Sequence, residues 1–145
     1  MGADDRPNEH LLVGTESFDA GTQATRVEGL MAIARSLRAS QINPANHILY
    51  IDLLEVAPTN ISCDARPRRF AWVGQLLLHT AVWLSRAQGA GGAVALHSLP
   101  QAEDFYRRHG LIDLGFDPSV YEGQLRYFEL DTNAAADIYA RGWAV

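Results

Sequence analysis

ILYIDLLEVAP, residues 48–58, is the strongest structural signal in this chain. The run is apolar and ends at a proline, which predicts a strand. An arginine-rich loop follows it, and residues 71–88 place apolar side chains along one helical face up to a glycine stop. Residues 93–97 predict a buried strand, and a second helix that closes at Gly110 comes next. Because a helix connects the two strands, we expect them to run parallel.

The loop before the first helix has the chemistry of an anion site. The first helical turn leaves N–H groups unpaired, and the helix dipole adds partial positive charge there. Gly74 has no Cβ and lets a phosphate oxygen approach the backbone, while Arg66, Arg68 and Arg69 can donate charge-assisted hydrogen bonds. The turn can therefore hold a pyrophosphate. The alternative is an ordinary connection whose arginines are only solvated.

Two segments resemble the GNAT superfamily of N-acetyltransferases. In that family the phosphate loop reads Arg/Gln-x-x-Gly-x-Gly/Ala, and RFAWVG at residues 69–74 falls on it. Further along, AEDFYRRHGL at residues 102–111 is similar to the family segment Ala-x-x-Phe-Tyr-x-x-x-Gly-Phe. The resemblance covers residues 25–130. Trp72 stands where the family has its first glycine, so either the loop is remodelled with its amides still available or pyrophosphate binding is impaired.

The resemblance implies an α/β fold with a twisted, mixed and mostly antiparallel sheet flanked by helices. This sheet would splay apart between the two parallel strands to admit a pantetheine arm. The usual first strand and helices of the family, which form part of the acceptor side, are lacking. We expect a flexible N-terminus over residues 1–9, a single domain over residues 10–130, and a C-terminal tail over residues 131–145 that packs on the domain or on a partner.

The activity implied by the resemblance is direct transfer of an acetyl group from acetyl-CoA to a primary amine of a small molecule or peptide. In the family, N–H groups beside a bulged strand hold the pantetheine arm and polarise the thioester carbonyl, which assigns Leu54, Glu55 and Val56 to the cofactor site. The phosphate loop and helix start assign the remaining cofactor-binding positions: Arg68, Arg69, Phe70, Ala71, Trp72, Val73, Gly74 and Gln75. The alternative is a catalytically inactive GNAT-like binding or assembly module, favoured by Trp72 and by Leu99, where the family often has Asn.

Acetyl transfer requires a neutral amine, a polarised carbonyl and a proton donor for the departing thiolate. Tyr106 matches the tyrosine that the family uses as this acid; otherwise it is a core aromatic residue. Asp52 and Glu55 are candidate bases, because a carboxylate in an apolar strand is costly to bury unless it is paired, hydrogen-bonded or functional. Pairing with an arginine is the structural alternative. Strand alternation places Tyr50, Asp52 and Leu54 on one face and Glu55 on the other, so only one carboxylate can face the thioester.

The rest of the chain predicts further strands. Residues 11–14 predict a short strand. Residues 26–35 have helical spacing, but the resemblance places a strand there, and an internal glycine would cost a helix about 1 kcal/mol. We expect this strand to pair with the one at residues 48–58. Residues 111–116 and 124–130 predict an antiparallel pair.

Two polar residues allow both a functional and a structural interpretation. Asn60 lies in the loop where the acceptor commonly approaches in the family, and its amide can equally make a local turn. His97 ends its strand near the place where the family has polar groups close to the cofactor. It can equally be a core or surface histidine.

Composition limits the partners. The net charge of −5 argues against a broad nucleic-acid surface. The single cysteine, Cys63, cannot form an internal disulfide, and no apolar run is long enough for a membrane span, so we expect a cytoplasmic protein. The histidines show no ligand spacing, which predicts no metal site. The open acceptor side suggests that a second copy of the chain, as a homodimer, or the tail around Trp143 completes it.

Overall fold

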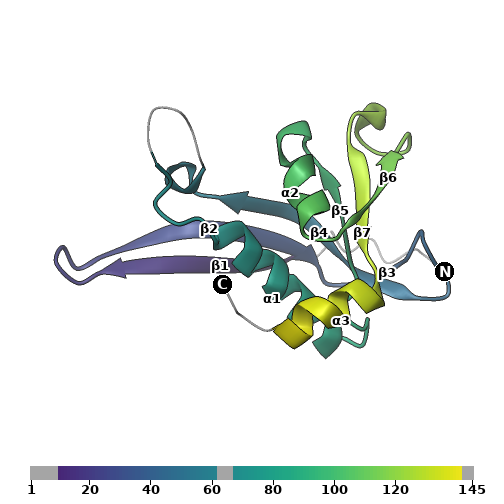
Figure 1. Cartoon of the computed structure of the whole chain (residues 1–145), viewed down its shortest axis with the longest axis horizontal. Helices are drawn as coiled ribbons and strands as arrows, with labels where there is room; N and C mark the ends of the chain where they lie inside the picture. The colour runs from purple at the N-terminus through teal and green to yellow at the C-terminus, as the bar shows by residue number, and fades with distance from the viewer. Residues whose placement is uncertain (1–9, 62–66, 142–145) are drawn as a thin grey trace, which may run out of the picture.

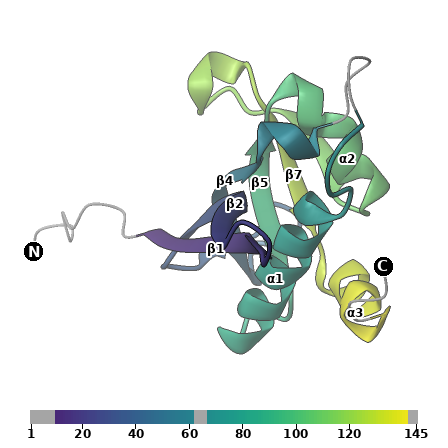
Figure 2. The ribbon, with the colours of Figure 1, turned by 90° about the vertical axis from the view of Figure 1, so that its left-hand side faces the viewer.

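The computed structural model describes residues 10–61 and 67–141, which form one sheet with α-helices on one of its faces (Figure 1, Figure 2). The strands are β1 His10–Asp19, β2 Ala24–Ala34, β3 Arg38–Ala39, β4 His47–Val56, β5 Val94–Ser98, β6 Ile112–Phe116 and β7 Arg126–Leu130. The helices are α1 Val73–Ala87, α2 Glu103–Arg108 and α3 Thr132–Arg141, with short 3-10 turns at Pro58–Asn60, Pro100–Ala102 and Tyr121–Gly123.

The predicted α/β class and mixed, mostly antiparallel sheet are confirmed. The strand order is β1-β2-β4-β5-β7-β6, with β3 paired to β4. Among the strand pairs of the described residues, only β4 and β5 run parallel, as the crossover through α1 predicts. The predicted antiparallel pair near the C-terminus is β6 and β7.

The first hairpin is longer than predicted. β1 runs over His10–Asp19, well beyond the short strand expected from its apolar start, and β2 pairs with it along its whole length. The extension is polar because this part of the hairpin projects from the body of the molecule into solvent (Figure 1). At its tip the Asp19 carboxylate accepts hydrogen bonds from the N–H groups of Gly21 and Thr22, which fixes the turn.

The core lies between the sheet and α1. Apolar side chains from one face of α1, among them Val73 and Leu77, pack on the helix-facing side of the central strands. Gly29 makes this close packing possible, because a Cβ there would lie 2.7 Å from Val73 Cγ1 and 2.9 Å from Leu77 Cδ1. The helix therefore lies directly against the backbone of β2.

The C-terminal segment packs on the body of this chain. Ala135 of α3 is fully buried, and Ile138 packs against the same core as α1. The predicted flexible segment at residues 1–9, and Cys63, Arg66 and Trp143, lie outside the described residues.

The sheet face away from the helices has its own small cluster, made of Ala34, Ile48, Tyr50, Ala93, Ala95 and Tyr127. Beside it the buried Glu129 carboxylate accepts hydrogen bonds from Ser40 Oγ, the Gln41 N–H and the Tyr127 hydroxyl. These bonds tie the connection after β3 to β7.

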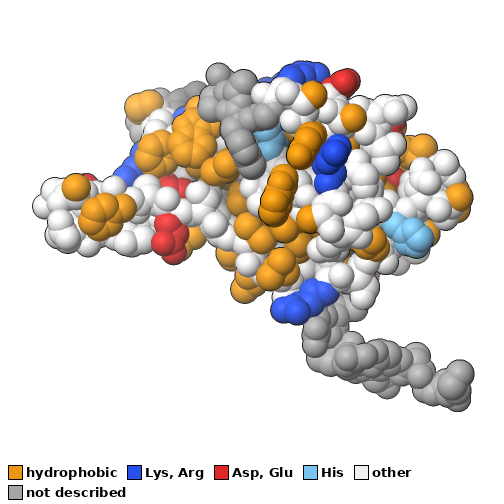
Figure 3. Space-filling view, turned by 90° about the horizontal axis from the view of Figure 1, so that it is seen from below, with side chains coloured by type: hydrophobic (Ala, Val, Ile, Leu, Met, Phe, Trp, Pro, Cys, Tyr) orange, Lys and Arg blue, Asp and Glu red, His pale blue; other side chains and the backbone are white. Residues whose placement is uncertain are grey.

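Seen from below, the surface of the molecule shows hydrophobic side chains over much of its middle, with few charged ones among them (Figure 3).

Candidate active site at the fork between β4 and β5

The two parallel strands pair over only three residues before they separate. Leu49, Tyr50 and Ile51 of β4 lie opposite Val94, Ala95 and Leu96 of β5, and β4 then continues to Val56 paired only with β2 among the described strands. Figure 1 shows the two strands diverging beyond this point. The structure therefore contains the predicted splay, and the cofactor positions 54–56 lie along the open edge of β4.

A bulge at Asp52 changes which side chains share a face. Ala32 lies opposite Leu53 and Ile33 lies opposite Ile51, so Asp52 is one extra residue in β4. The prediction that Tyr50, Asp52 and Leu54 share a face is wrong, because Leu54 packs on the helix-side core whereas Tyr50 belongs to the cluster on the other face. A single extra residue shifts the alternation of the rest of the strand.

Neither candidate base is buried. Asp52 and Glu55 are both exposed, so the expectation of a costly buried carboxylate does not hold for either of them. Asp52 Oδ2 lies 2.6 Å from His10 Nε2, where an arginine was the expected partner. Both carboxylates lie beyond the last β4–β5 pair, near the fork.

The predicted phosphate loop leads directly into α1. Trp72 is the N-cap residue, makes no side-chain capping hydrogen bond, and stacks its half-exposed ring at a tilt on Phe70, 5.5 Å away between ring centroids. The space over Gly74 is taken by an aromatic ring, because a Cβ there would lie 3.2 Å from Phe105 Cζ. In this structure Gly74 thus makes room for α2.

Arg69 has a partner within the chain. Its guanidinium lies 3.8 Å from the carboxylate of Glu28, which is 2 % exposed and accepts hydrogen bonds from Ser17 Oγ and from Asn60 Nδ2. The Ser17 hydroxyl first, then the Asn60 amide and Arg69, lower the pKa of Glu28. Asn60 Oδ1 also accepts the N–H of Phe70. Asn60 therefore has a structural role, holding the loop against β2.

Arg68 differs from Arg69 in its exposure, and Glu28 was not among the predicted site residues. Arg68 is exposed. Nothing in the sequence around Glu28 distinguishes it from a surface residue, except that it interrupts an apolar strand. A bulge in β2 opposite Thr15 and Glu16 gives this carboxylate its inward position.

Tyr106 lies on the inner side of α2 at the core. It is 5 % exposed, with its ring against Phe105 and Phe128 at centroid distances of 5.2 and 5.8 Å. Burial raises the pKa of Tyr106 to about 12. The phenol therefore keeps its proton at neutral pH, which is the form that a proton donor needs.

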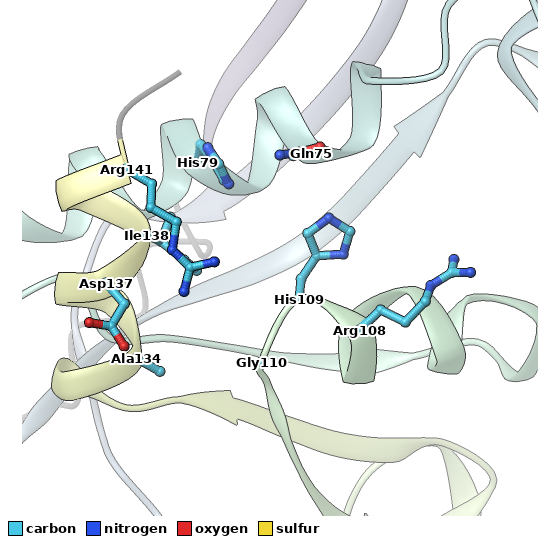
Figure 4. Close-up of a pocket in the computed structure, with 9 residues that line it drawn as sticks. All are labelled: Gln75, His79, Arg108, His109, Gly110, Ala134, Asp137, Ile138 and Arg141. Atoms are coloured by element: carbon cyan, nitrogen blue, oxygen red, sulfur yellow. The ribbon is translucent and has the colours of Figure 1, made fainter. Parts of the chain in front are cut away.

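A pocket of about 370 Å³ lies between α1, the end of α2 and α3 (Figure 4). The residues that line it are Gln75, His79, Arg108, His109, Gly110, Ala134, Asp137, Ile138 and Arg141. Four of these side chains are cationic or can become so, against one carboxylate. Burial, and then the neighbouring charges of His109 and Arg141, lower the pKa of His79. Of the predicted cofactor residues only Gln75 lines this pocket, because α3 and the end of α2, which supply the cations, are remote in sequence.

Residues 10–61 and 67–141 contain no group of three His, Cys, Asp or Glu side chains arranged to hold a metal ion. In the same part of the chain no helix has the length and apolar character needed to cross a membrane.

Comparison with known proteins finds likeness in structure. No protein-family model matches the sequence, and no curated protein matches it. An acetyltransferase from Bacillus cereus ATCC 14579 aligns with a TM-score of 0.52 at 20 % identity, over 89 % of this chain and 79 % of that one. The KacTA–DNA complex aligns with a TM-score of 0.58 at 19 % identity, over 89 % and 73 %.

A third neighbour was solved with a cosubstrate. A mutant of the AtaT toxin, bound to the C-terminus of the antitoxin AtaR and to acetyl-CoA, aligns with a TM-score of 0.52 at 16 % identity, over 79 % of this chain and 66 % of that one. Sequence identities of 20 % or less support a shared fold and nothing more. These alignments show that the chain shares the fold of these acetyltransferase and toxin structures.

Proposed function

We propose that the protein is an N-acetyltransferase that moves the acetyl group of acetyl-CoA directly to a primary amine of a small molecule or peptide. The observation that carries this proposal is the fork, where the bulged part of β4 leaves β5 beside the start of α1. An open strand edge binds an extended, amide-containing chain through backbone hydrogen bonds. The pantetheine arm of acetyl-CoA is such a chain, and Leu54, Glu55 and Val56 would hold it.

The phosphates of acetyl-CoA need cations. The predicted loop offers Arg68, Arg69 and the amides of residues 71–75 around the start of α1, while the Phe70 amide is bonded to Asn60. The pocket of Figure 4, which lies further along α1, offers Arg108 of α2 and Arg141 of α3. We assign the pyrophosphate to the loop and the phosphorylated nucleoside end to the pocket. Gln75 belongs to both regions, which supports one continuous binding surface along α1.

Tyr106 would act as the acid. Its phenol can protonate the departing thiolate while the N–H groups of β4 polarise the thioester carbonyl. Asp52 or Glu55 would receive the proton of the amine, directly or through water. Asp52 is held by His10, whereas Glu55 is exposed on β4.

The competing function is an inactive GNAT-like binding or assembly module. Two contacts favour it: the Phe105 ring covers Gly74, and Arg69 already faces Glu28. Both would have to adjust before a pyrophosphate could bind at the loop. The bulky Trp72 at the N-cap adds to this obstacle.

The proposed setting is the cytoplasm, without membrane or nucleic-acid partners and with a second copy of the chain completing the acceptor side. The net charge of −5 supports the absence of a nucleic-acid partner, although one structural neighbour was solved with DNA. Light scattering that finds a monomer with full turnover would contradict the second copy. A gel shift with duplex DNA or tRNA at low salt would contradict the absence of a nucleic-acid partner.

Calorimetric titration of the full chain with acetyl-CoA tests the proposal. We expect binding that Arg69→Ala and Arg141→Ala each weaken about tenfold, the effect of one charge-assisted contact. Arg86→Ala is the matched control, because Arg86 lies at the other end of α1, over the Tyr139 ring. Absence of binding to the wild-type chain would favour the assembly module.

A further inference from the structure

On the face opposite the helices, three residues remote in sequence form a hydrogen-bonded chain. The Tyr50 hydroxyl lies 2.5 Å from His97 Nδ1, and His97 Nε2 lies 2.9 Å from Asp117 Oδ2. The three come from β4, β5 and the connection that follows β6. Only 6 % of the His97 side chain and 13 % of the Asp117 side chain are exposed.

Asp117 determines how the protons are arranged in this chain. Its Oδ1 accepts hydrogen bonds from both the N–H and the hydroxyl of Ser119, while Oδ2 faces the imidazole. The Ser119 hydroxyl first, and then His97, lower the pKa of Asp117 to about 2, so it is a carboxylate throughout the neutral range. A carboxylate can only accept, so His97 Nε2 carries a hydrogen. In the neutral ring Nδ1 is therefore the acceptor, and the Tyr50 hydroxyl donates to it.

The position of this chain in the sheet connects it to the fork. Ile51 and Leu96 form the last β4–β5 pair, Tyr50 comes one residue before that pair, and His97 comes one residue after it. Tyr50 belongs to the cluster on the helix-free face, whereas Tyr106 belongs to the core on the helix side. The two phenols thus lie on opposite faces of the sheet, and Tyr50 is 6 % exposed beside the point where β4 and β5 separate.

We infer that Asp117, His97 and Tyr50 form a proton relay that receives the proton of the attacking amine in place of Asp52 or Glu55. This inference rests on the proposed acetyl transfer. As the amine nitrogen bonds to the acetyl carbon and the carbon–sulfur bond breaks, the amine gives its proton to Tyr50 Oη, and the tyrosine hydroxyl proton passes to His97 Nδ1. The thiolate takes the proton of Tyr106, and the resulting phenolate regains a proton from solvent. The imidazolium, stabilised by the Asp117 carboxylate, then returns its proton to solvent.

In this assignment Tyr50 is the catalytic residue, and His97 and Asp117 act through it. The charged and titratable groups around the ring include Asp117, Tyr50 with Arg38 over its face, and Tyr127, whose hydroxyl is bonded to Glu129. Tyr127 offers a matched control. It presents a second phenol to the same imidazole, at a centroid distance of 5.1 Å, but its hydroxyl points to Glu129.

The test is the steady-state release of CoA with a primary-amine acceptor found by screening, measured for Tyr50→Phe, Asp117→Asn and Tyr127→Phe. Tyr50→Phe should lower kcat about 100-fold, the usual contribution of a positioned proton acceptor, with the acetyl-CoA Kd unchanged. Asp117→Asn should lower kcat and move the acid limb of the pH–rate profile to lower pH, because the imidazolium loses its counter-charge. Tyr127→Phe should keep the wild-type kcat.

Three outcomes would count against the relay, and they differ in whether they also contradict the proposed acetyl transfer. Wild-type kcat in both Tyr50→Phe and Asp117→Asn overturns the relay and leaves acetyl transfer standing. An equal loss in Tyr127→Phe assigns the effect to packing and also overturns the relay. A wild-type chain that neither binds acetyl-CoA nor releases CoA overturns the proposed function, and the catalytic role of Tyr50 with it. If Tyr50→Phe fails to fold, the partly exposed Asp117→Asn decides through its pH–rate profile.

Discussion

Replacing Gly29 with alanine should destabilise the protein by pushing α1 away from the sheet. The new Cβ would lie 2.7 Å from Val73 Cγ1, 2.9 Å from Leu77 Cδ1 and 3.2 Å from the Glu55 carbonyl oxygen. Val73 and Leu77 are both 1 % exposed, so neither side chain has free space to move into. The helix itself must shift.

The size of the effect follows from two opposing contributions. Overpacking of this kind costs about 1–3 kcal/mol. Replacing glycine by alanine also restricts the unfolded chain, which returns about 0.4–1 kcal/mol. At the middle of both ranges we expect a net loss of about 1 kcal/mol, which lowers Tm by roughly 2–4 °C for a domain of this size. Because α1 begins at the fork, the acetyl-CoA Kd should rise as well.

Urea unfolding followed by circular dichroism measures the loss directly. Gly14→Ala is the matched control, because a Cβ there would make only ordinary contacts, 3.6 Å from the Gly29 carbonyl oxygen and 3.9 Å from Leu30 Cδ1. We expect Gly14→Ala to be as stable as the wild-type chain or slightly more so. Equal midpoints for Gly29→Ala and Gly14→Ala would refute the packing of α1 on the backbone of β2.

Three further predictions concern charge and catalysis. The pKa of Glu28 is lowered in the folded state, so the stabilising effect of this carboxylate is present above its unfolded pKa and is lost as the pH falls through its folded pKa. The urea midpoint of Glu28→Gln should therefore fall less between pH 6 and pH 3 than that of the wild-type chain. Tyr106→Phe should lower kcat about 100-fold with the acetyl-CoA Kd unchanged, and equal kcat values would remove Tyr106 as the acid. Binding of acetyl-CoA should weaken with added salt, and less steeply in Arg108→Ala; identical slopes would place the phosphates outside the pocket.

The order of elements could be predicted from sequence because each signal is local. An apolar run, a helical face and a glycine stop suffice to place β4, α1 and β5, and a helix between two strands makes them parallel. The apolar pattern predicts only the inner part of β1, because the outer part belongs to a solvent-exposed hairpin with a polar sequence. Local apolar patterns predict only the strands that are packed against something.

The site was harder to predict because its features depend on register and on distant partners. The bulge at Asp52 is one extra residue that no sequence pattern indicates, and it places Leu54 on the opposite sheet face from the predicted one. Tyr50, His97 and Asp117 meet only because β4, β5 and the chain after β6 adjoin in the folded sheet. The cations of the pocket likewise come from different helices.

Transfer of a labelled acetyl group from acetyl-CoA to a panel of primary amines and amino-terminal peptides tests the central claim most directly. Mass spectrometry of the products should find an acceptor that gains one acetyl group as CoA is released, at a rate proportional to protein concentration and sharply reduced in Tyr106→Phe. Tight binding of acetyl-CoA without transfer to any acceptor, or no binding at all, would contradict the account and favour a GNAT-like assembly module.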